Sequence, residues 1–336
     1  MQLRNLGSSG VKVSPICLGA MMFGHRTNQA TAVRITDMAR DAGVNFIDTA
    51  DIYADGASER ITGRAIKKHR QHWVLATKAG QRPDPDQPNR GGLSRRWLLR
   101  SIEESLARLG TDFIDIFYFH RQDLGTALDE SVRAIGDAIK AGKLRYFGIS
   151  NFRAWRHGEV VWLCKALGVD KPVASQPYYN AMNRMPEVEL LPACAHYGIG
   201  VVPYSPIARG VLTGKYQPGA APRKGTRAGR SDRRMMETEF REESMVMAQE
   251  IKAHAEARGM TGGQFALNWV LANPIVTSAI VGPRTLGQMK DYLGALSHGW
   301  ITEDEALVDR LVASGHPSTP GYNDPLYPIE GRPTRV

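Results

Sequence analysis

The stretch IDIFYFH, residues 114–120, is a short apolar run that ends in a histidine. Apart from Asp115, its side chains are apolar at successive positions, so apolar groups face both sides of a strand. Seven further runs have this character: ICLGA (16–20), NFID (45–48), WVLATK (73–78), YFGIS (146–150), VASQ (173–176), GVVPYS (200–205) and SAIVG (278–282). Strands that are apolar throughout are typical of a parallel sheet covered on both faces.

Amphipathic segments lie between these predicted strands. LLRSIEESLARLG (98–110) and ALDESVRAIGDAIKAG (127–142) carry apolar residues at three- and four-residue spacing, and glycine stands near the end of each, as at a helix C-terminus. Eight units of strand followed by helix predict an α/β fold, a parallel (β/α)8 TIM barrel. A doubly wound sheet would normally carry GxGxxG after its first strand, and GAMMFG (19–24) does not match that pattern.

The same pattern predicts one domain over residues 1–336. QLRNL and VKVS, on either side of the turn residues SSG, predict a β-hairpin near the N-terminus. Two segments are longer than ordinary barrel connections: a loop over 205–243, with its basic insertion at 217–243, and a proline-rich tail over 315–336. Loops of this length at the rim of a barrel are often functional.

The net charge of +9 is concentrated in RKGTRAGRSDRR (223–234), which has six basic residues and one acid. No aromatic residue separates these arginines, so we expect no nucleic-acid partner and favour a solvated loop or one that binds a small polyphosphate. No run approaches the roughly 20 apolar residues of a membrane span. Three well-separated cysteines suit a cytoplasmic protein without disulfides, and the pair His69 and His72 has no further ligand nearby, so we expect no metal.

Polar residues follow the predicted strands at the point where each ends. Asp48, Lys78 and His120 end three successive strands, and Tyr53 comes five residues after Asp48. Other strand ends carry Ser150, Asn151, Gln176, Tyr204, Ser205, Gly282 and Arg284. In barrels of this kind the chemistry takes place at the carboxyl ends of the strands. Each residue alone has an ordinary explanation, as a turn cap or a packing residue, but their convergence on one rim predicts an active site.

Elementary electrostatics suggests how the first four residues act together. An ammonium about 4 Å from a phenol, at an effective dielectric constant of about 20, lowers the phenol's pKa by about three units. Lys78 is therefore predicted to bring the pKa of Tyr53 into the range useful for a general acid. Burial would discharge the lysine, and Asp48 would keep it ionised. His120 would hydrogen-bond a substrate carbonyl oxygen or share the proton transfer.

The chain resembles the aldo-keto reductases over essentially its whole length, and most of all the bacterial branch related to potassium-channel β subunits. The resemblance rests on GVNFIDTADIYADGASE, ATKAG, IDIFYFHRQD, RYFGISNF and YSPIARGVLTGKY, which occur in family order. The family's catalytic tetrad falls on Asp48, Tyr53, Lys78 and His120. The resemblance implies a barrel whose base is closed by the N-terminal hairpin. It also implies a nicotinamide cofactor bound in an extended form.

The resemblance also implies the cofactor contacts. Tyr204 would stack on the nicotinamide, and Ser150, Asn151 and Gln176 would hold its carboxamide. The other implied contacts are Ala20, Met21, Asp48, Ser205, Pro206, Ile207, Ala208, Gly210, Lys215, Gly282, Arg284, Gln288 and Asp291. Thr285 and Gln288 predict a capping box opening a helix, whose N-terminal amides favour a phosphate. Arg284 and the basic loop favour NADPH/NADP over NADH/NAD. Tyr292, where the family usually has an asparagine, and Pro283 depart from its pattern.

The function implied is NADPH-dependent reduction of an aldehyde or ketone to the alcohol, or the reverse oxidation, with a small carbonyl or alcohol as substrate. Selectivity would come from Met21, Met22 and Phe23, from the stretch after His120, and from the tail around Tyr322 and Tyr327. These side chains suit an apolar or aromatic carbonyl, or they simply pack. Two alternatives remain: a binding module that senses the redox state of the cofactor with slow turnover, and a barrel hydrolase or lyase. The sequence sets no oligomeric state.

Overall fold

The computed structural model describes residues 1–81, 85–329 and 331. These residues form two compact units, each described by itself. The first, called the strand unit, comprises residues 1–178, 189–204 and 273–293. The second, called the helical unit, comprises the described residues of 179–188, 205–272 and 294–336. The single-domain organisation expected for 1–336 stays a prediction.

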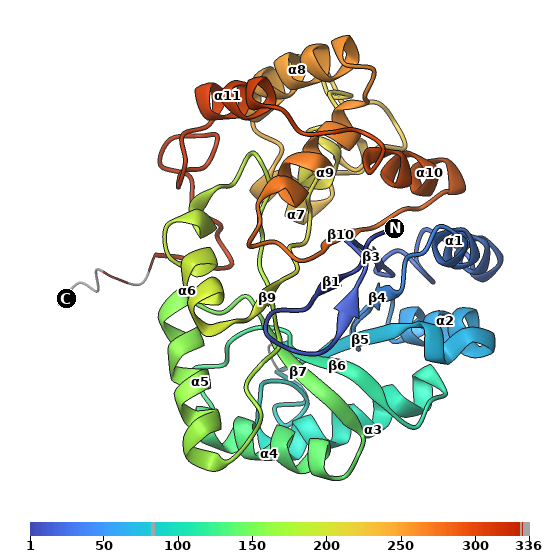
Figure 1. Cartoon of the computed structure of the whole chain (residues 1–336), viewed down its shortest axis with the longest axis vertical. Coiled ribbons are helices and arrows are strands. Elements are labelled where there is room, and N and C mark those ends of the chain that lie inside the picture. The colour runs from blue at the N-terminus through green and yellow to red at the C-terminus, as the bar shows by residue number, and fades with distance from the viewer. Residues whose placement is uncertain (82–84, 330, 332–336) are drawn as a thin grey trace. The chain divides into compact units, whose positions relative to one another are not determined.

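The strand unit is built on eight parallel strands in the spatial order β10-β3-β4-β5-β6-β7-β8-β9 (Figure 1). The strands are β3 (Ile16–Gly19), β4 (Phe46–Asp48), β5 (Val74–Ala79), β6 (Ile114–Phe119), β7 (Leu144–Ser150), β8 (Ala174–Gln176), β9 (Gly200–Val201) and β10 (Ala279–Val281). Each overlaps one of the eight predicted runs. The register pairs Gly19 with Asp48, and Asp48 with Ala76, so the ends of neighbouring strands stand at similar heights.

Backbone hydrogen bonds also join the two ends of this sheet. The Thr277 N–H donates to the Val201 carbonyl at 2.9 Å, and the Ile280 N–H donates to the Pro203 carbonyl at 2.9 Å. These bonds close the eight strands into a ring and confirm the predicted (β/α)8 barrel. Strand β9 is shorter than the predicted run at 200–205, which includes Pro203, a residue without the N–H that a regular ladder needs.

Helices follow the strands along the chain. They are α1 (Gln29–Asp41), α2 (Ala57–Ile66), α3 (Arg95–Leu109), α4 (Leu128–Lys140), α5 (Ala154–Leu167), α6 (Leu190–Tyr197) and α10 (Leu286–Ala295), with a 3-10 segment η1 (Lys67–His72) after α2. The structure confirms the two helices predicted at 98–110 and 127–142. Gly110 ends α3 with φ of 64°, and its N–H donates to the Leu106 carbonyl, as a helix stop requires.

The helical unit contains α7 (Arg233–Thr238), α8 (Glu242–Ala257), α9 (Gly262–Ala272) and α11 (Thr302–Leu311), with 3-10 turns η2 (Met185–Glu187), η3 (Ala208–Gly210) and η4 (Ala228–Arg230). The predicted loop over 205–243 therefore contains η3, η4 and α7. The described part of the tail packs against the 205–243 segment. Arg234 pairs with Asp324 at 2.6 Å, and the Arg241 guanidinium lies 3.8 Å from the Tyr322 ring centroid. Residues 330 and 332–336 of the predicted tail lie outside the described residues.

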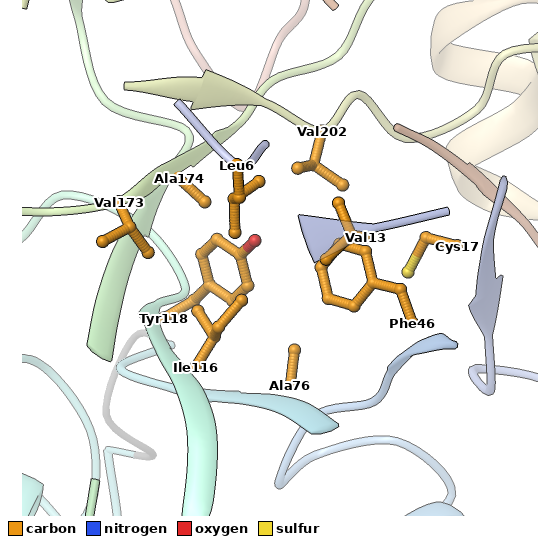
Figure 2. Packing of buried hydrophobic residues seen from close by; sticks show 10 residues of the cluster. All are labelled: Leu6, Val13, Cys17, Phe46, Ala76, Ile116, Tyr118, Val173, Ala174 and Val202. Carbon is orange, nitrogen blue, oxygen red and sulfur yellow. The ribbon is translucent and has the colours of Figure 1, made fainter. Parts of the chain in front are cut away.

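The hairpin formed by β1 (Arg4–Asn5) and β2 (Lys12–Val13) closes the amino-terminal end of the barrel. Leu6 and Val13 are fully buried in one cluster with Phe46 and Tyr118 from the strands (Figure 2). The Ser8 N–H donates to the Gly198 carbonyl just before β9, at 2.8 Å. The base closure implied by the family resemblance is confirmed. In the described ranges, no helix is long and apolar enough to cross a membrane.

Removing the Leu6 side chain tests the hairpin as a structural plug. Leu6→Ala leaves a cavity in a fully buried cluster, so we expect the free energy of unfolding to fall by about 2–5 kcal/mol. Leu3→Ala is the control, because 40% of Leu3 is exposed. Chemical denaturation measures both. Equal, small effects of the two substitutions would contradict the role given to the hairpin.

Candidate active site

A buried ion pair lies at the carboxyl ends of β4 and β5. The Lys78 Nζ is 2.5 Å from Asp48 Oδ1, and the exposed fractions of the two side chains are 0% and 4%. The ammonium also donates to the Thr49 carbonyl at 2.6 Å. The other carboxylate oxygen, Asp48 Oδ2, accepts from Gln176 Nε2 at 3.0 Å. Residues from three different strands therefore hold one fixed arrangement of charge.

The charge state of this pair follows from its partners. Burial lowers the pKa of the Lys78 ammonium, but Asp48, with help from Tyr53, outweighs burial and raises that pKa above its ordinary value. Burial raises the pKa of Asp48, and Lys78 opposes the shift. At 2.5 Å the ionised pair is the arrangement that satisfies both groups. The prediction that Asp48 keeps Lys78 charged agrees with this geometry.

Tyr53 lies beside the ammonium, in the loop between β4 and α2. The Lys78 Nζ is 5.0 Å from the centroid of the Tyr53 ring. Burial, with the charges of Asp48 and Asp51, raises the pKa of Tyr53 above its ordinary value, although Lys78 acts to lower it. The sequence predicted a net decrease, and that prediction is wrong for this structure. The lysine acts in the expected direction, but the argument from an ammonium alone left out the cost of burying a phenolate.

His120 completes the group from the end of β6. Its ring meets the Tyr53 ring edge to face, with centroids 5.9 Å apart. Burial, then the charges of Lys78 and Arg121, hold the pKa of His120 well below 6.5, so the imidazole is neutral at pH 7. Its buried Nδ1 has no hydrogen-bond partner among the described residues. A neutral imidazole with an unpaired nitrogen can form a hydrogen bond with a ligand, and it brings no positive charge to the site.

Four more predicted site residues form a connected network on the strand unit. Asn151 adopts φ of 57° and donates through Nδ2 to the His120 carbonyl at 2.9 Å. Its Oδ1 accepts from the Tyr204 hydroxyl at 2.9 Å, and the Tyr204 ring stacks on Tyr178 with centroids 5.7 Å apart. Ser150 donates to the Gln176 carbonyl at 2.8 Å. The structure therefore brings Ser150, Asn151, Gln176 and Tyr204 together with the tetrad.

The remaining predicted residues of the strand unit follow β3 and β10. The Ala20 N–H donates to the Asp48 carbonyl at 2.8 Å, and Met21 after it is exposed. Gly282 and Arg284 follow β10, and Asp291 lies in α10. Gln288 accepts from the Arg284 N–H at 2.7 Å while its own N–H donates to Thr285 Oγ1. The predicted cap thus forms with its return bond one residue earlier than in a standard capping box. Tyr292 is buried.

The helical unit holds the predicted run Ser205, Pro206, Ile207, Ala208 and Gly210, together with Lys215. A pocket of about 440 Å³ in this unit is lined by Thr213, Gly214, Lys215, Tyr216, Gln217, Ala220, Ala221, Pro222, Arg223 and Lys252. Three of these side chains are cationic and none is acidic. The N–H groups of Ser205 and Ile207 donate to no acceptor among the residues described. Cations and open amides are the chemistry that fits phosphate oxygens.

Burial and hydrogen bonding bear on the side chains expected either to face a substrate or to pack. Met22 and Phe23 are buried and pack in the core. Met21, which precedes them in the loop after β3, is exposed. Tyr322 donates to the Glu237 carbonyl within the helical unit. Ile52 and Leu124, large apolar side chains on the loops after β4 and β6, are exposed.

Sequence reasoning also missed an acidic pair next to the tetrad. Glu59, in the first turn of α2, is fully buried, accepts from Thr77 Oγ1 at 2.6 Å and pairs with Arg108 Nε at 2.5 Å. Asp51 Oδ1 is buried with no donor in the described part of the chain. Burial, and then the charge of Glu59, raise the pKa of Asp51 to about 7. The sequence signal for this pair is the run of acidic residues in DTADIYADGASE (48–59), which is more polar than an ordinary turn.

Comparisons with known proteins agree with the fold. A sequence profile described as the aldo/keto reductase family matches residues 15–313. A probable voltage-gated potassium channel subunit beta of Arabidopsis thaliana is 36% identical, covering 88% of this chain and 91% of that protein. An uncharacterized oxidoreductase of Bacillus subtilis, YrpG, is 36% identical, covering 93% and 95%. An L-glyceraldehyde 3-phosphate reductase of Escherichia coli O157:H7 is 32% identical, covering 94% and 93%. The chain belongs to the aldo/keto reductase family of oxidoreductases.

Asp51 supplies a pH-dependent test of the local electrostatics. Its folded-state pKa of about 7 exceeds the ordinary value of 3.8, so ionisation opposes folding. The penalty is absent below about pH 4, grows as pH rises toward 7 and is constant above it. We therefore expect Asp51→Asn to stabilise the protein by about 1–3 kcal/mol at pH 8 and by nearly nothing at pH 4. Denaturation at both pH values, with exposed Asp55→Asn as control, measures this. A pH-independent difference would contradict the shift.

Proposed function

We propose that the protein reduces an aldehyde or ketone to the alcohol, or catalyses the reverse oxidation, with NADPH/NADP as the redox cofactor. The observation that carries this proposal is the buried Asp48–Lys78 ion pair beside Tyr53, with neutral His120 against the same ring. This arrangement offers a proton donor, a fixed positive charge to stabilise the anion that the donor leaves, and a neutral hydrogen-bond donor for an oxygen.

Each residue of the site would have one task. A reduced nicotinamide, when bound, supplies the hydride that a carbonyl carbon accepts. Tyr53 would give its hydroxyl proton to the carbonyl oxygen, and the Lys78 ammonium would stabilise the resulting phenolate. Asp48 would keep that ammonium charged in a buried site. His120 would donate a hydrogen bond to the carbonyl oxygen and orient it. In the oxidation direction the same phenolate would act as the base.

The donor set of the chain fits a phosphorylated dinucleotide. Ser150, Asn151, Gln176 and Tyr204 would hold the nicotinamide end, next to the tetrad. The run from Ser205 to Gly210 and Lys215 would meet the pyrophosphate. Arg223 and Lys252 add positive charge at the same pocket as Lys215, which suits the phosphates of a dinucleotide. The preference for NADP over NAD would come from Arg284 at the adenosine end. Gly282, Arg284, Gln288 and Asp291 would surround the adenosine end, and Ala20 and Met21 would lie near the nicotinamide.

The substrate proposal is an apolar or aromatic carbonyl compound. Met21, Ile52 and Leu124 follow β3, β4 and β6 and are all exposed, so apolar side chains stand on three of the loops that follow strands of the barrel. We further propose that the protein is cytoplasmic, which is consistent with three buried cysteines that form no disulfide in the structure.

A second candidate is a cofactor-binding module that turns over slowly. One relative favours testing it, since the Arabidopsis thaliana protein is a probable voltage-gated potassium channel subunit beta. The two functions differ in rate: the reductase consumes NADPH continuously with a suitable carbonyl, whereas the module binds NADPH tightly and completes a turnover only slowly on every carbonyl in a broad panel.

Tyr53→Phe tests the proposed general acid. The substitution removes the hydroxyl and leaves the ring beside Lys78, so we expect kcat for NADPH oxidation with the best carbonyl of a panel to fall about 100-fold or more. NADPH affinity should change little. Tyr197→Phe, on the outer helix α6, is the control and should behave as the wild type. Absorbance at 340 nm follows the reaction, and a Tyr53→Phe enzyme with wild-type kcat would contradict the assignment.

A further inference from the structure

The segment from Ser205 to Gly210 has an unusual backbone. Ser205, Ala208 and Arg209 adopt φ values of 58°, 47° and 48°, in the left-handed region that residues with a side chain rarely occupy. Ala208 and Arg209 do so in succession. Such a conformation persists only where surrounding contacts impose it. The question is therefore which contacts hold this segment.

Contacts within the helical unit hold it at its start, middle and end. The Ser205 carbonyl accepts from Asn180 Nδ2 at 3.0 Å. The Gly210 carbonyl accepts from Thr213 Oγ1 at 2.8 Å. Between them, Arg209 Nε donates to Glu239 Oε2 at 2.8 Å. The first two are single neutral hydrogen bonds, and the third is an ion pair, which is the stronger kind.

The Glu239 contact is buried as well as charged. Glu239 is fully buried, and the Arg209 side chain is 12% exposed. Glu239 follows α7 directly, and its N–H donates to the Met235 carbonyl at 3.0 Å, so its position is fixed by the end of that helix. The Thr238 hydroxyl donates to the same carboxylate oxygen that Arg209 contacts. The guanidinium is thus held from a rigid, buried anchor.

This contact also changes the role expected of Arg209. An arginine in a segment proposed to face phosphates would ordinarily be assigned to a phosphate, but the charge of Arg209 is already matched by Glu239. What the segment offers a ligand is backbone: the N–H groups of Ser205 and Ile207 have no acceptor within the described ranges. The neighbouring cation is Lys215, whose Nζ lies 2.6 Å from where a Cβ on Gly210 would stand. The placement of amides and ammonium depends on the shape of the segment.

We propose that Glu239, acting through Arg209, is a positioning residue that holds Ser205–Gly210 in its left-handed conformation and thereby sets the affinity for the phosphates of the dinucleotide. The inference rests on the proposed function for the ligand. The restraint on the segment itself is a separate claim that needs no ligand.

Glu239→Gln tests the proposal, with Glu237→Gln as the matched control. The control removes one negative charge two residues earlier, where Glu237 pairs with Arg233 and Arg234 instead of Arg209. Dissociation constants for NADPH come from quenching of tryptophan fluorescence. We expect the Kd of Glu239→Gln to rise about tenfold or more, and that of Glu237→Gln to stay within about twofold of the wild type. At saturating NADPH, kcat should change much less than Kd.

A readout without cofactor separates the two claims. Trypsin cleavage at the Arg209–Gly210 bond, followed by mass spectrometry, should be at least several-fold faster in Glu239→Gln than in the wild type and in Glu237→Gln. If Glu239→Gln does not fold, the double variant Arg209→Met/Glu239→Met, which leaves no buried charge, replaces it and should show the same weaker binding. A folded variant with wild-type Kd overturns the proposal. A wild type that binds no NADPH overturns the proposed function and the affinity claim together, even where cleavage at Arg209 accelerates.

Discussion

The proposed chemistry of this protein depends on the buried ion pair between Asp48 and Lys78. A lysine with no exposed surface would lose its proton unless a carboxylate stood beside it, and here the two groups are 2.5 Å apart. The ammonium gives Tyr53 a neighbour that favours the phenolate. The same positive charge, together with burial, keeps His120 neutral. The pair thereby influences the pKa of both Tyr53 and His120.

The barrel makes this interaction possible because it brings strand ends from distant parts of the chain to one height. Asp48 ends β4, Lys78 lies near the end of β5, and Gln176 ends β8. Tyr118 and other buried side chains of the strands pack in the apolar interior of the barrel (Figure 2). Exclusion of water strengthens the attraction between Lys78 and a phenolate, but it also raises the pKa of Tyr53 in the structure at hand. Burial is therefore the cause of both the stronger attraction and the raised pKa of Tyr53.

Strand positions and the clustering of Asp48, Tyr53, Lys78 and His120 could be predicted from the sequence, because continuous apolar runs and the polar residues that end them are local features. The net pKa shift of Tyr53 could not, since it depends on how deeply the ring is buried. Nor could the fate of Met22 and Phe23, because an apolar residue on a rim loop looks the same whether it faces a substrate or the core. Asp51, Glu59 and Arg108 were not predicted because they come from the turn after β4, from α2 and from α3, and no local pattern links these three segments. Arg209 and Glu239 are 30 residues apart in the sequence, so no local pattern predicts their contact.

The charge of Lys78 is the most direct test of the account. NMR of protein labelled at lysine Cε and Nζ, with Lys78→Met to assign the signal, follows its ionisation against pH in the wild type and in Asp48→Asn. The account predicts that Lys78 stays an ammonium to above pH 10 in the wild type and that its pKa falls by at least two units in Asp48→Asn. A Lys78 that is neutral at pH 7 in the wild type, or one whose pKa is unchanged by the loss of the carboxylate, would contradict the account.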